Sequence, residues 1–392
     1  MLSRYLHFTH CTQLCVQMDL PHHTNMLYDE SMLTKEIIQR IPKVELHDHL
    51  DGGLRIQTIL ELAEEYDVKL PSNDPQELHD WFIRGCKQKS LKLYLEPFSV
   101  TTKVMQTQKA LKRVAFEAVQ DLAKENVCYA EIRFAPILHI QGGLSLEQVV
   151  QAVLDGLDQG KRHTGMPTGL ILCAMRNQSP VVSKTIAELA VAFADRGVVG
   201  FDLAGDEIGY PPKKHLDAFQ FIRNKNFNIT IHAGEAFGVE SIWQAIQLCG
   251  AHRIGHGVRL VEDMGLQGSR IEEMGSLANF ILDRRIPMEM CLTSNVGTGA
   301  AKDYASHPFP IFFRNKFRVF LSSDNRLMSD TNLTKEMELA VQYYNLSLRD
   351  LEKITINAMK SAFIHHDQKL SIIYDVIKKQ YSDIRQQYGV LD

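Results

Sequence analysis

The sequence predicts a single (β/α)8 TIM barrel, an α/β fold in which eight parallel strands alternate with helices. Two observations lead to this prediction. Eight short apolar runs are separated by amphipathic segments, and most of each run is continuously apolar, as in parallel strands that are covered on both faces. In addition, histidine and carboxylate residues gather at the carboxyl ends of these runs, where barrel proteins place their functional groups.

The elements follow one another in regular order from residue 42 onward. The predicted strands span residues 42–49, 129–136, 169–176, 198–205, 228–235, 252–257, 287–295 and 317–325. Apolar residues at helical spacing predict helices between them, over residues 145–163, 182–196, 211–225, 238–249 and 271–285. The first of these helices begins with the capping pair Ser145 and Gln148.

Three parts of the chain depart from this alternation. About 80 residues separate the first two strands, too many for one loop, so we expect extra helices there, including residues 56–66 and 91–98. The chain from Leu333 onward is rich in Glu, Lys, Gln and Leu, which predicts extra helices at the C-terminus. Residues 1–34 lack periodicity and are predicted to be a poorly ordered extension, which leaves 35–392 as the single folded domain.

The composition favours a small-molecule partner. A formal net charge of -4 over 392 residues offers no basic field for nucleic acid or an anionic membrane. No apolar stretch reaches the roughly 18 residues of a membrane span. The seven scattered cysteines are typical of buried free thiols in a reducing compartment. We therefore expect a cytoplasmic protein that is a monomer or a weak homo-oligomer.

Three histidines and an aspartate predict a metal site. His47 and His49 in VELHDHLDGG are two positions apart on a strand, so their side chains share one face while Asp48 faces the other. With His232 in ITIHAGE and Asp324 in VFLSSDN they form a nitrogen and oxygen set suited to zinc, with one position left for water. A lone histidine in an apolar run is more often a hydrogen-bonded core residue, but the HxH pair favours the metal site.

Two further residues are candidates for proton transfer. Glu235 follows His232 by three positions, where it could exchange a proton beside the metal, cap the next helix, or do both; the catalytic role is favoured. His256, in the segment RIGHG, could bind the metal or act as a base on water. His252, at the start of the same strand, belongs to the opposite rim and is predicted to be structural.

The end of the fourth strand indicates one metal ion. Barrel hydrolases of this metal type that hold two ions bridge them with a modified lysine at this position. The strand here ends in DLAGD, without a lysine. One Zn²⁺ per chain is the expected cofactor.

From about Pro42 to Phe363 the chain resembles the adenosine deaminase family of the amidohydrolase superfamily. The segments that carry the resemblance are KVELHDHLDGGLRIQTILELA, YAEIRFAP, VVGFDLAGDE, ITIHAGE, RIGHG, EMCLTSN and SSDNRLMS. The resemblance implies a zinc-dependent enzyme of purine salvage or catabolism. It would convert adenosine and 2′-deoxyadenosine to inosine and deoxyinosine and release ammonia.

The resemblance also implies catalytic roles. The residues that match the zinc ligands are His47, His49, His232 and Asp324. His256 and Asp324 would position and deprotonate the water that attacks carbon 6 of the purine, and Glu235 would protonate ring nitrogen 1.

The substrate contacts that it implies are His49, Asp51, Gly205 and Asn325. The N–H of Gly205 would bind purine nitrogen 3, and Asp51 would hold the ribose 5′-hydroxyl and repel a 5′-phosphate. Animal members carry an aspartate where this chain has Asn325, next to purine nitrogen 7, and an amide can still donate there. A helix with the apolar residues Tyr94, Leu95 and Phe98 could cover the purine base. We favour the alternative that it is a plain core helix.

Two alternatives stay open at this point. The substrate could be another 6-aminopurine, either adenine or N6-methyl-AMP. From a different class, the chain could be a nucleoside-binding or growth-factor-like protein with incidental or lost catalysis, but the complete set of polar site residues argues against this.

Overall fold

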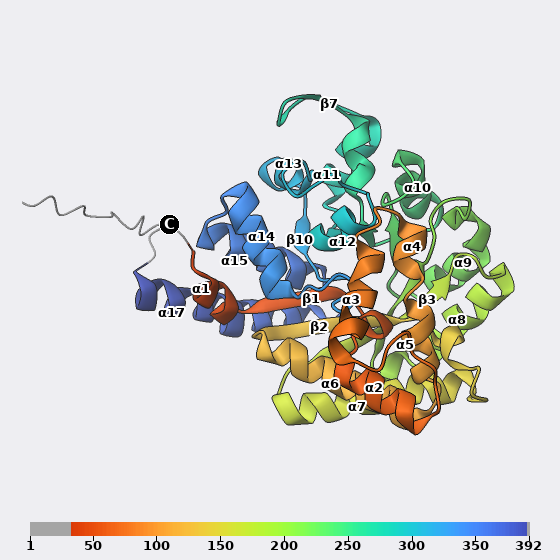
Figure 1. The fold of residues 1–392 in the computed structure, drawn as a ribbon. Coiled ribbons are helices and arrows are strands. Elements are labelled where there is room, and N and C mark those ends of the chain that lie inside the picture. Colours follow the sequence, from red (N-terminus) through yellow and green to blue (C-terminus); the bar gives the residue numbers. More distant parts are fainter. Residues whose placement is uncertain (1–32, 390–392) are drawn as a thin grey trace, which may run out of the picture. The chain divides into compact units, whose positions relative to one another are not determined.

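The computed structural model describes residues 33–389 and shows a closed parallel barrel surrounded by helices (Figure 1). The strands form two four-stranded sheets, in the orders β1-β2-β3-β4 and β10-β9-β6-β5. Parallel bridges from Phe201 to Ile229 and from Asp48 to Asp324 join the two sheets at both edges. Eight strands therefore close into one barrel, and the predicted fold is confirmed.

The barrel strands are short, and their side chains are almost all buried. They are Lys43–His49 (β1), Val127–Phe134 (β2), Thr168–Met175 (β3), Val198–Ala204 (β4), Thr230–Ala233 (β5), Arg253–His256 (β6), Met288–Met290 (β9) and Val319–Leu321 (β10). The strand predicted over 287–295 is wrong in its second half, where helix α12 (Leu292–Gly297) begins. The N–H of Asn295 donates to the carbonyl of Cys291, which makes a helical turn directly after β9.

A second correction concerns the segment before β9. The helix predicted over 271–285 is wrong in its first residues, because Arg270–Met274 forms strand β8. This strand pairs antiparallel with Met264–Gln267 (β7), outside the barrel, through a turn in which Gly268 has a φ of +62°. The helix itself, α11, spans Ser276–Arg284.

Helices fill the insertion after β1 and flank the barrel, as predicted, but the helix expected over residues 91–98 ends at Leu95 and another begins at Phe98. The insertion contains Ile56–Glu65 (α2), Pro75–Cys86 (α3), Leu91–Leu95 (α4), Phe98–Val104 (α5) and Gln108–Lys124 (α6). The helices between later strands are Leu146–Thr164 (α7), Pro180–Ala192 (α8), Leu216–Asn224 (α9), Val239–Trp243 (α10) and Phe309–Arg314 (α13). The predicted capping box is present in α7, where Ser145 and Gln148 each accept the other's backbone N–H.

Five more helices lie at the two ends of the described chain. They are Lys35–Arg40 (α1), Leu333–Tyr344 (α14), Leu348–Ser361 (α15), His366–Ser371 (α16) and Lys378–Tyr388 (α17). Short 3-10 or π turns occur at Leu50–Gly52, Pro136–His139, Ala194–Arg196, Pro212–His215, Gln244–Leu248, Val258–Asp263 and Ile372–Ile377. None of the helices between residues 33 and 389 is long and apolar enough to cross a membrane. Most of the predicted extension, residues 1–32, lies outside the described residues.

Candidate metal centre and active site

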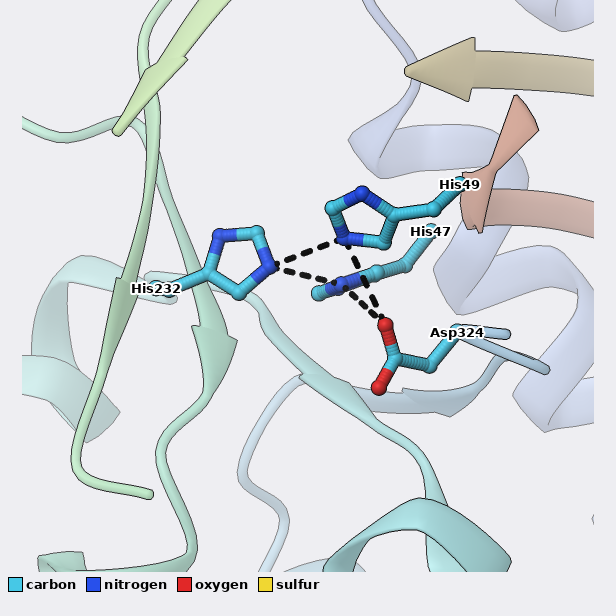
Figure 2. A group of neighbouring side chains, drawn as sticks. All are labelled: His47, His49, His232 and Asp324. Carbon is cyan, nitrogen blue, oxygen red and sulfur yellow. Dashed lines mark hydrogen bonds and ion pairs between the residues drawn. The ribbon is translucent and has the colours of Figure 1, made fainter. Parts of the chain in front are cut away.

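Four side chains converge at the carboxyl ends of the strands, as Figure 2 shows. His232 Nε2 lies 3.1 Å from the Nε2 atoms of both His47 and His49. The Oδ1 atom of Asp324 lies 3.3 Å from His47 Nε2 and 3.4 Å from His49 Nε2. Strand β1, strand β5 and the segment after β10 thus bring together all four predicted metal ligands.

The spacing of these four atoms fits one metal ion. Ligands that surround zinc tetrahedrally at about 2.1 Å are about 3.4 Å apart, close to the separations observed here. Three imidazole nitrogens and one carboxylate oxygen are donors that zinc accepts. The donor set therefore suits a single divalent ion.

Buried carboxylates orient two of the ligand histidines. Glu289 Oε2 on β9 lies 2.7 Å from His47 Nδ1, and Asp202 Oδ1 on β4 lies 3.1 Å from His232 Nδ1. A carboxylate at Nδ1 fixes the proton there and leaves Nε2 free for a metal. Asp48 faces away from the site, and its Oδ1 accepts a hydrogen bond from Arg326 Nε at 3.0 Å.

Two site residues have a left-handed backbone. Asp324 has a φ of +62° and His256 a φ of +65°, a region that residues other than glycine seldom adopt. Backbone hydrogen bonds hold Asp324 in place, because its N–H donates to the carbonyl of His47 and its own carbonyl accepts from the N–H of His49. The Ser294 hydroxyl donates to Asp324 Oδ2 at 2.6 Å, which leaves Oδ1 facing the histidines. Such strain at two strand ends is typical of a functional site.

Burial and charge set the protonation of the ligands. Burial lowers the pKa of His232 and brings the pKa of His49 well below its ordinary value, so both rings are neutral. Burial opposes ionisation of Asp324, but its hydrogen bond with His47 and the surrounding histidines hold its pKa well below the usual range. Burial also lowers the pKa of His47, but hydrogen bonds to Asp324 and Glu289 outweigh it and raise the pKa to about 9. A metal must therefore displace one proton from His47.

A cavity of about 300 Å³ is lined by three of the four candidate ligands, namely His49, His232 and Asp324. Three oxygens of its lining residues are buried without a hydrogen-bond partner, namely Asp51 Oδ1, Glu235 Oε1 and Asn325 Oδ1. Buried polar atoms without partners are rare in folded proteins, and they indicate a place for a polar ligand. Among the described residues, no lysine or arginine lines this cavity.

Glu235 lies within this cavity and faces His256, with 3.6 Å between Glu235 Oε2 and His256 Nε2. Burial, together with the charges of Asp324 and Glu207, raises the pKa of Glu235 to about 8. The alternative role of Glu235 as a helix cap is wrong, because Glu207 accepts hydrogen bonds from the N–H groups of residues 234–237. Helix α10 begins later, after Gly238.

The raised pKa of Glu235 predicts a pH dependence of stability in the metal-free protein. A carboxyl group whose pKa is higher in the folded state binds more protons there, so its contribution to stability falls as the pH rises from about 4.5 to 8. We expect the free energy of unfolding of the Glu235→Gln variant, relative to the wild type, to rise over this range. Urea denaturation at a series of pH values measures it; a constant difference would contradict the raised pKa.

A chain of hydrogen bonds fixes the tautomer of His256. The N–H of Cys291 donates to Asn295 Oδ1, so the amide nitrogen of Asn295 faces His256 Nδ1 at 3.0 Å. His307 supports this orientation, since its Nδ1 accepts from a backbone N–H and its Nε2 lies 3.2 Å from Asn295 Oδ1. A neutral His256 therefore carries its proton on Nε2, where it can donate a hydrogen bond into the cavity. His256 is not part of the four-residue donor group.

The remaining predicted contacts line the same cavity. Gly205 has a φ of +103°, and its N–H forms no hydrogen bond with another described residue. The apolar wall contains Leu91, Tyr94, Leu95 and Phe98. The preference for a plain core helix there is wrong, because these side chains line the cavity as well as the core.

The two glycines in HLDGG make room for the residues after the metal aspartate. A Cβ atom at Gly52 would overlap Asn325 Oδ1, and one at Gly53 would come within 2.6 Å of Arg326 Nη2.

His252 lies at the other rim of the barrel, where its Nδ1 accepts a hydrogen bond from the N–H of Ile229 at 3.0 Å. This contact with the backbone supports the predicted structural role.

A buried network of charges under the metal centre was not predicted from the sequence. Arg133 on β2 donates to Asp202 and to Glu289, and Arg253 on β6 donates to Glu289 and to Glu131. All five side chains are fully or almost fully buried. Charged residues inside predicted strands could have indicated this network, because such residues are seldom buried unless they are paired.

Comparisons with known proteins agree over most of the chain. The sequence model of a family described as adenosine deaminase matches residues 42–379. A protein of Mycobacterium sp. (strain KMS) named adenosine deaminase is 51% identical over 356 residues, which cover 89% of this chain and 98% of that protein. The crystal structure of an adenine deaminase from Arthrobacter aurescens has a TM-score of 0.79 at 24% identity, over 88% of this chain and 99% of that one. The structure of the N6-methyl-AMP deaminase from Arabidopsis thaliana has a TM-score of 0.75 at 26% identity, over 90% of this chain and 100% of that one.

Proposed function

The chain belongs to the adenosine deaminase family, and we propose that it deaminates adenosine with one Zn²⁺ held by His47, His49, His232 and Asp324. It is a hydrolytic deaminase, which converts adenosine to inosine and ammonia. The observation that carries the residue assignment is the cavity, because its lining combines three of the four metal donors with three residues that have a buried, partnerless oxygen. A bound zinc ion supplies a water nucleophile that is reactive at neutral pH.

Glu235 and His256 act on the two sides of the reacting carbon. Burial and nearby carboxylates raise the pKa of Glu235 to about 8 in the metal-free protein, which favours the protonated form. Glu235 gives this proton to purine nitrogen 1, which makes carbon 6 a better electrophile. His256 donates a hydrogen bond from Nε2 and orients the attacking water, while Asp324 accepts a hydrogen bond from the same water. As water adds to carbon 6, one of its protons passes to Asp324 and from there to the amino nitrogen, so cleavage of the bond from carbon 6 to that nitrogen releases ammonia. The second proton leaves the new hydroxyl as the carbonyl of the product forms and returns to Glu235. This assignment makes His256 a donor, in place of the base that the sequence suggested.

The other end of the cavity suits a nucleoside. Asp51 Oδ1 is buried without a partner and would accept the 5′-hydroxyl of ribose or deoxyribose. The Gly205 N–H would bind purine nitrogen 3, and the Asn325 side-chain amide would donate to purine nitrogen 7. His49 would contact the substrate beside the metal. Arg326, which directly follows Asn325, is held by Asp48 and does not line the cavity. A 5′-phosphate would meet the charge of Asp51 without a cation to offset it.

A comparison of substrates tests this assignment. We expect kcat/KM for adenosine to exceed that for adenine and AMP by at least about 100-fold, because a site built to bind a hydroxyl rejects ligands that leave it unpaired. The Asp51→Asn variant should lose about 10-fold on adenosine and discriminate less against AMP. Ammonia release from adenosine, 2′-deoxyadenosine, adenine, AMP and N6-methyl-AMP measures both effects. Faster turnover of adenine or of either nucleotide would assign the chain to that substrate.

The cellular context forms part of the proposal. All five cysteines within residues 33–389 are free thiols, which supports the reducing, cytoplasmic location expected from the sequence. The roles in purine salvage or catabolism follow from the reaction. A domain that spans residues 35–392 and a monomeric or weakly associating state stay predictions.

A further inference from the structure

A second cavity lies at the opposite end of the barrel from the metal centre. Its volume is about 780 Å³, and residues at the amino-terminal ends of the strands line it, including Val198 of β4, Arg253 of β6 and Arg318 before β10. Helices α15 and α16 and the segment between them contribute Lys360, Phe363 and Lys369. Nothing in the deamination reaction uses this end of the molecule.

The charge of this lining is strongly one-sided. Arg253 is neutralised by Glu131 and Glu289. Five other cations line the cavity, and none of them forms an ion pair with a residue between 33 and 389; they are Arg284, Arg285, Arg318, Lys360 and Lys369. Asp195 is the one carboxylate among the described lining residues. The cavity therefore presents a surplus of positive charge.

Two of the arginines that line this cavity each have a buried nitrogen without a partner. Arg318 Nε and Arg253 Nη2 form no hydrogen bond in the described structure. Burial and the charge of Arg285 lower the pKa of Arg318. Burial, and then the charges of Arg253 and Arg318, lower the pKa of Lys369 although Glu131 opposes this. Cations that are held close together and partly desolvated gain from an anion placed between them.

We propose that this cavity is a binding site for a small anion with two or more phosphate groups. Guanidinium groups match phosphate oxygens with two parallel hydrogen bonds, and several cations suit a ligand with several negative charges. Arg318 and Lys369 bind the phosphates from opposite sides, one from the barrel floor and one from α16. Inorganic polyphosphate and a nucleoside triphosphate share this chemistry.

Calorimetric titration of the zinc-loaded full chain with inorganic tripolyphosphate, at constant ionic strength, tests the proposal. We expect one saturable site per chain, with the Kd raised at least about 10-fold in a variant that combines Arg318→Gln and Lys369→Gln. Arg253 is unsuitable for this test because its partner Glu289 also contacts His47. A parallel titration with CTP, which lacks a purine, distinguishes the two ligand sources. If CTP binds more tightly than tripolyphosphate does, the site is assigned to a nucleotide.

A matched variant with Arg270→Gln and Lys213→Gln controls for the loss of two charges. Both residues are exposed and lie outside the cavity lining. The control should bind tripolyphosphate like the wild type, and both variants should keep the thermal stability and the deaminase activity of the wild type. Absence of saturable binding would overturn the proposal, and so would equal binding by the two variants. Extraction of zinc by tripolyphosphate would likewise give the same heat in both variants.

Discussion

Glu235→Gln is expected to lose about 10²- to 10⁴-fold in kcat for adenosine while it keeps its zinc, the range that a general acid contributes. In the metal-free protein, burial and nearby carboxylates raise the pKa of Glu235 to about 8, which favours the neutral acid. Glutamine has nearly the same shape and can still donate a hydrogen bond, but it cannot release a proton to the purine ring. The loss of adenosine absorbance measures kcat, and metal analysis of the purified variant measures zinc.

Glu240→Gln is the matched control for this prediction. Glu240 is five positions further along the chain and exposed, and among residues 33–389 its side chain forms a hydrogen bond only with Gln244. The same chemical change there should leave kcat and zinc content unaltered. Full activity of Glu235→Gln would remove Glu235 from the proton transfer, and a variant without zinc would show that the residue supports the metal centre instead.

The site could be predicted from the sequence because its residues lie at or just after the carboxyl ends of apolar strands. His47, His232 and Asp324 belong to three separate strand ends, and the closure of a parallel barrel brings those ends together. The HxH pattern placed His47 and His49 on one face by strand geometry alone. The positions of these side chains thus depend on the topology and on a two-residue period, and both can be recognised from sequence.

Other features depend on contacts that no local pattern encodes. Glu207 accepts four backbone N–H groups from a loop about 30 residues away, and Asn295 orients His256 only because α12 begins directly after β9. The strand predicted through Asn295 would have placed its side chain differently. The β7–β8 hairpin was missed because Gly268 and Ser269 form a two-residue turn inside a segment whose apolar residues also fit a helix.

Glu289→Gln is expected to destabilise the protein and weaken zinc binding together. Glu289 Oε1 accepts from Arg253 Nε at 2.6 Å and from Thr230 at 2.9 Å, while Oε2 accepts from Arg133 at 2.8 Å and lies 2.7 Å from His47 Nδ1. Removal of one partner from a buried ion pair costs about 3–5 kcal/mol, because the remaining charge is left uncompensated. Loss of the carboxylate behind a metal-binding histidine weakens metal affinity about 10- to 100-fold. Urea denaturation of the metal-free protein and competition for zinc with a chelator measure the two effects separately.

Glu131→Gln separates the two roles of this network. Glu131 Oε2 accepts from Arg253 Nη1 at 2.6 Å, so this variant also leaves a buried arginine short of a carboxylate, but Glu131 makes no contact with a metal ligand. It should therefore lower the free energy of unfolding and leave zinc affinity unchanged. If both variants weakened zinc equally, the loss would come from general loosening of the barrel. If Glu289→Gln alone weakened it, the contact between Glu289 and His47 would be the cause, because both variants remove a carboxylate from the same arginine.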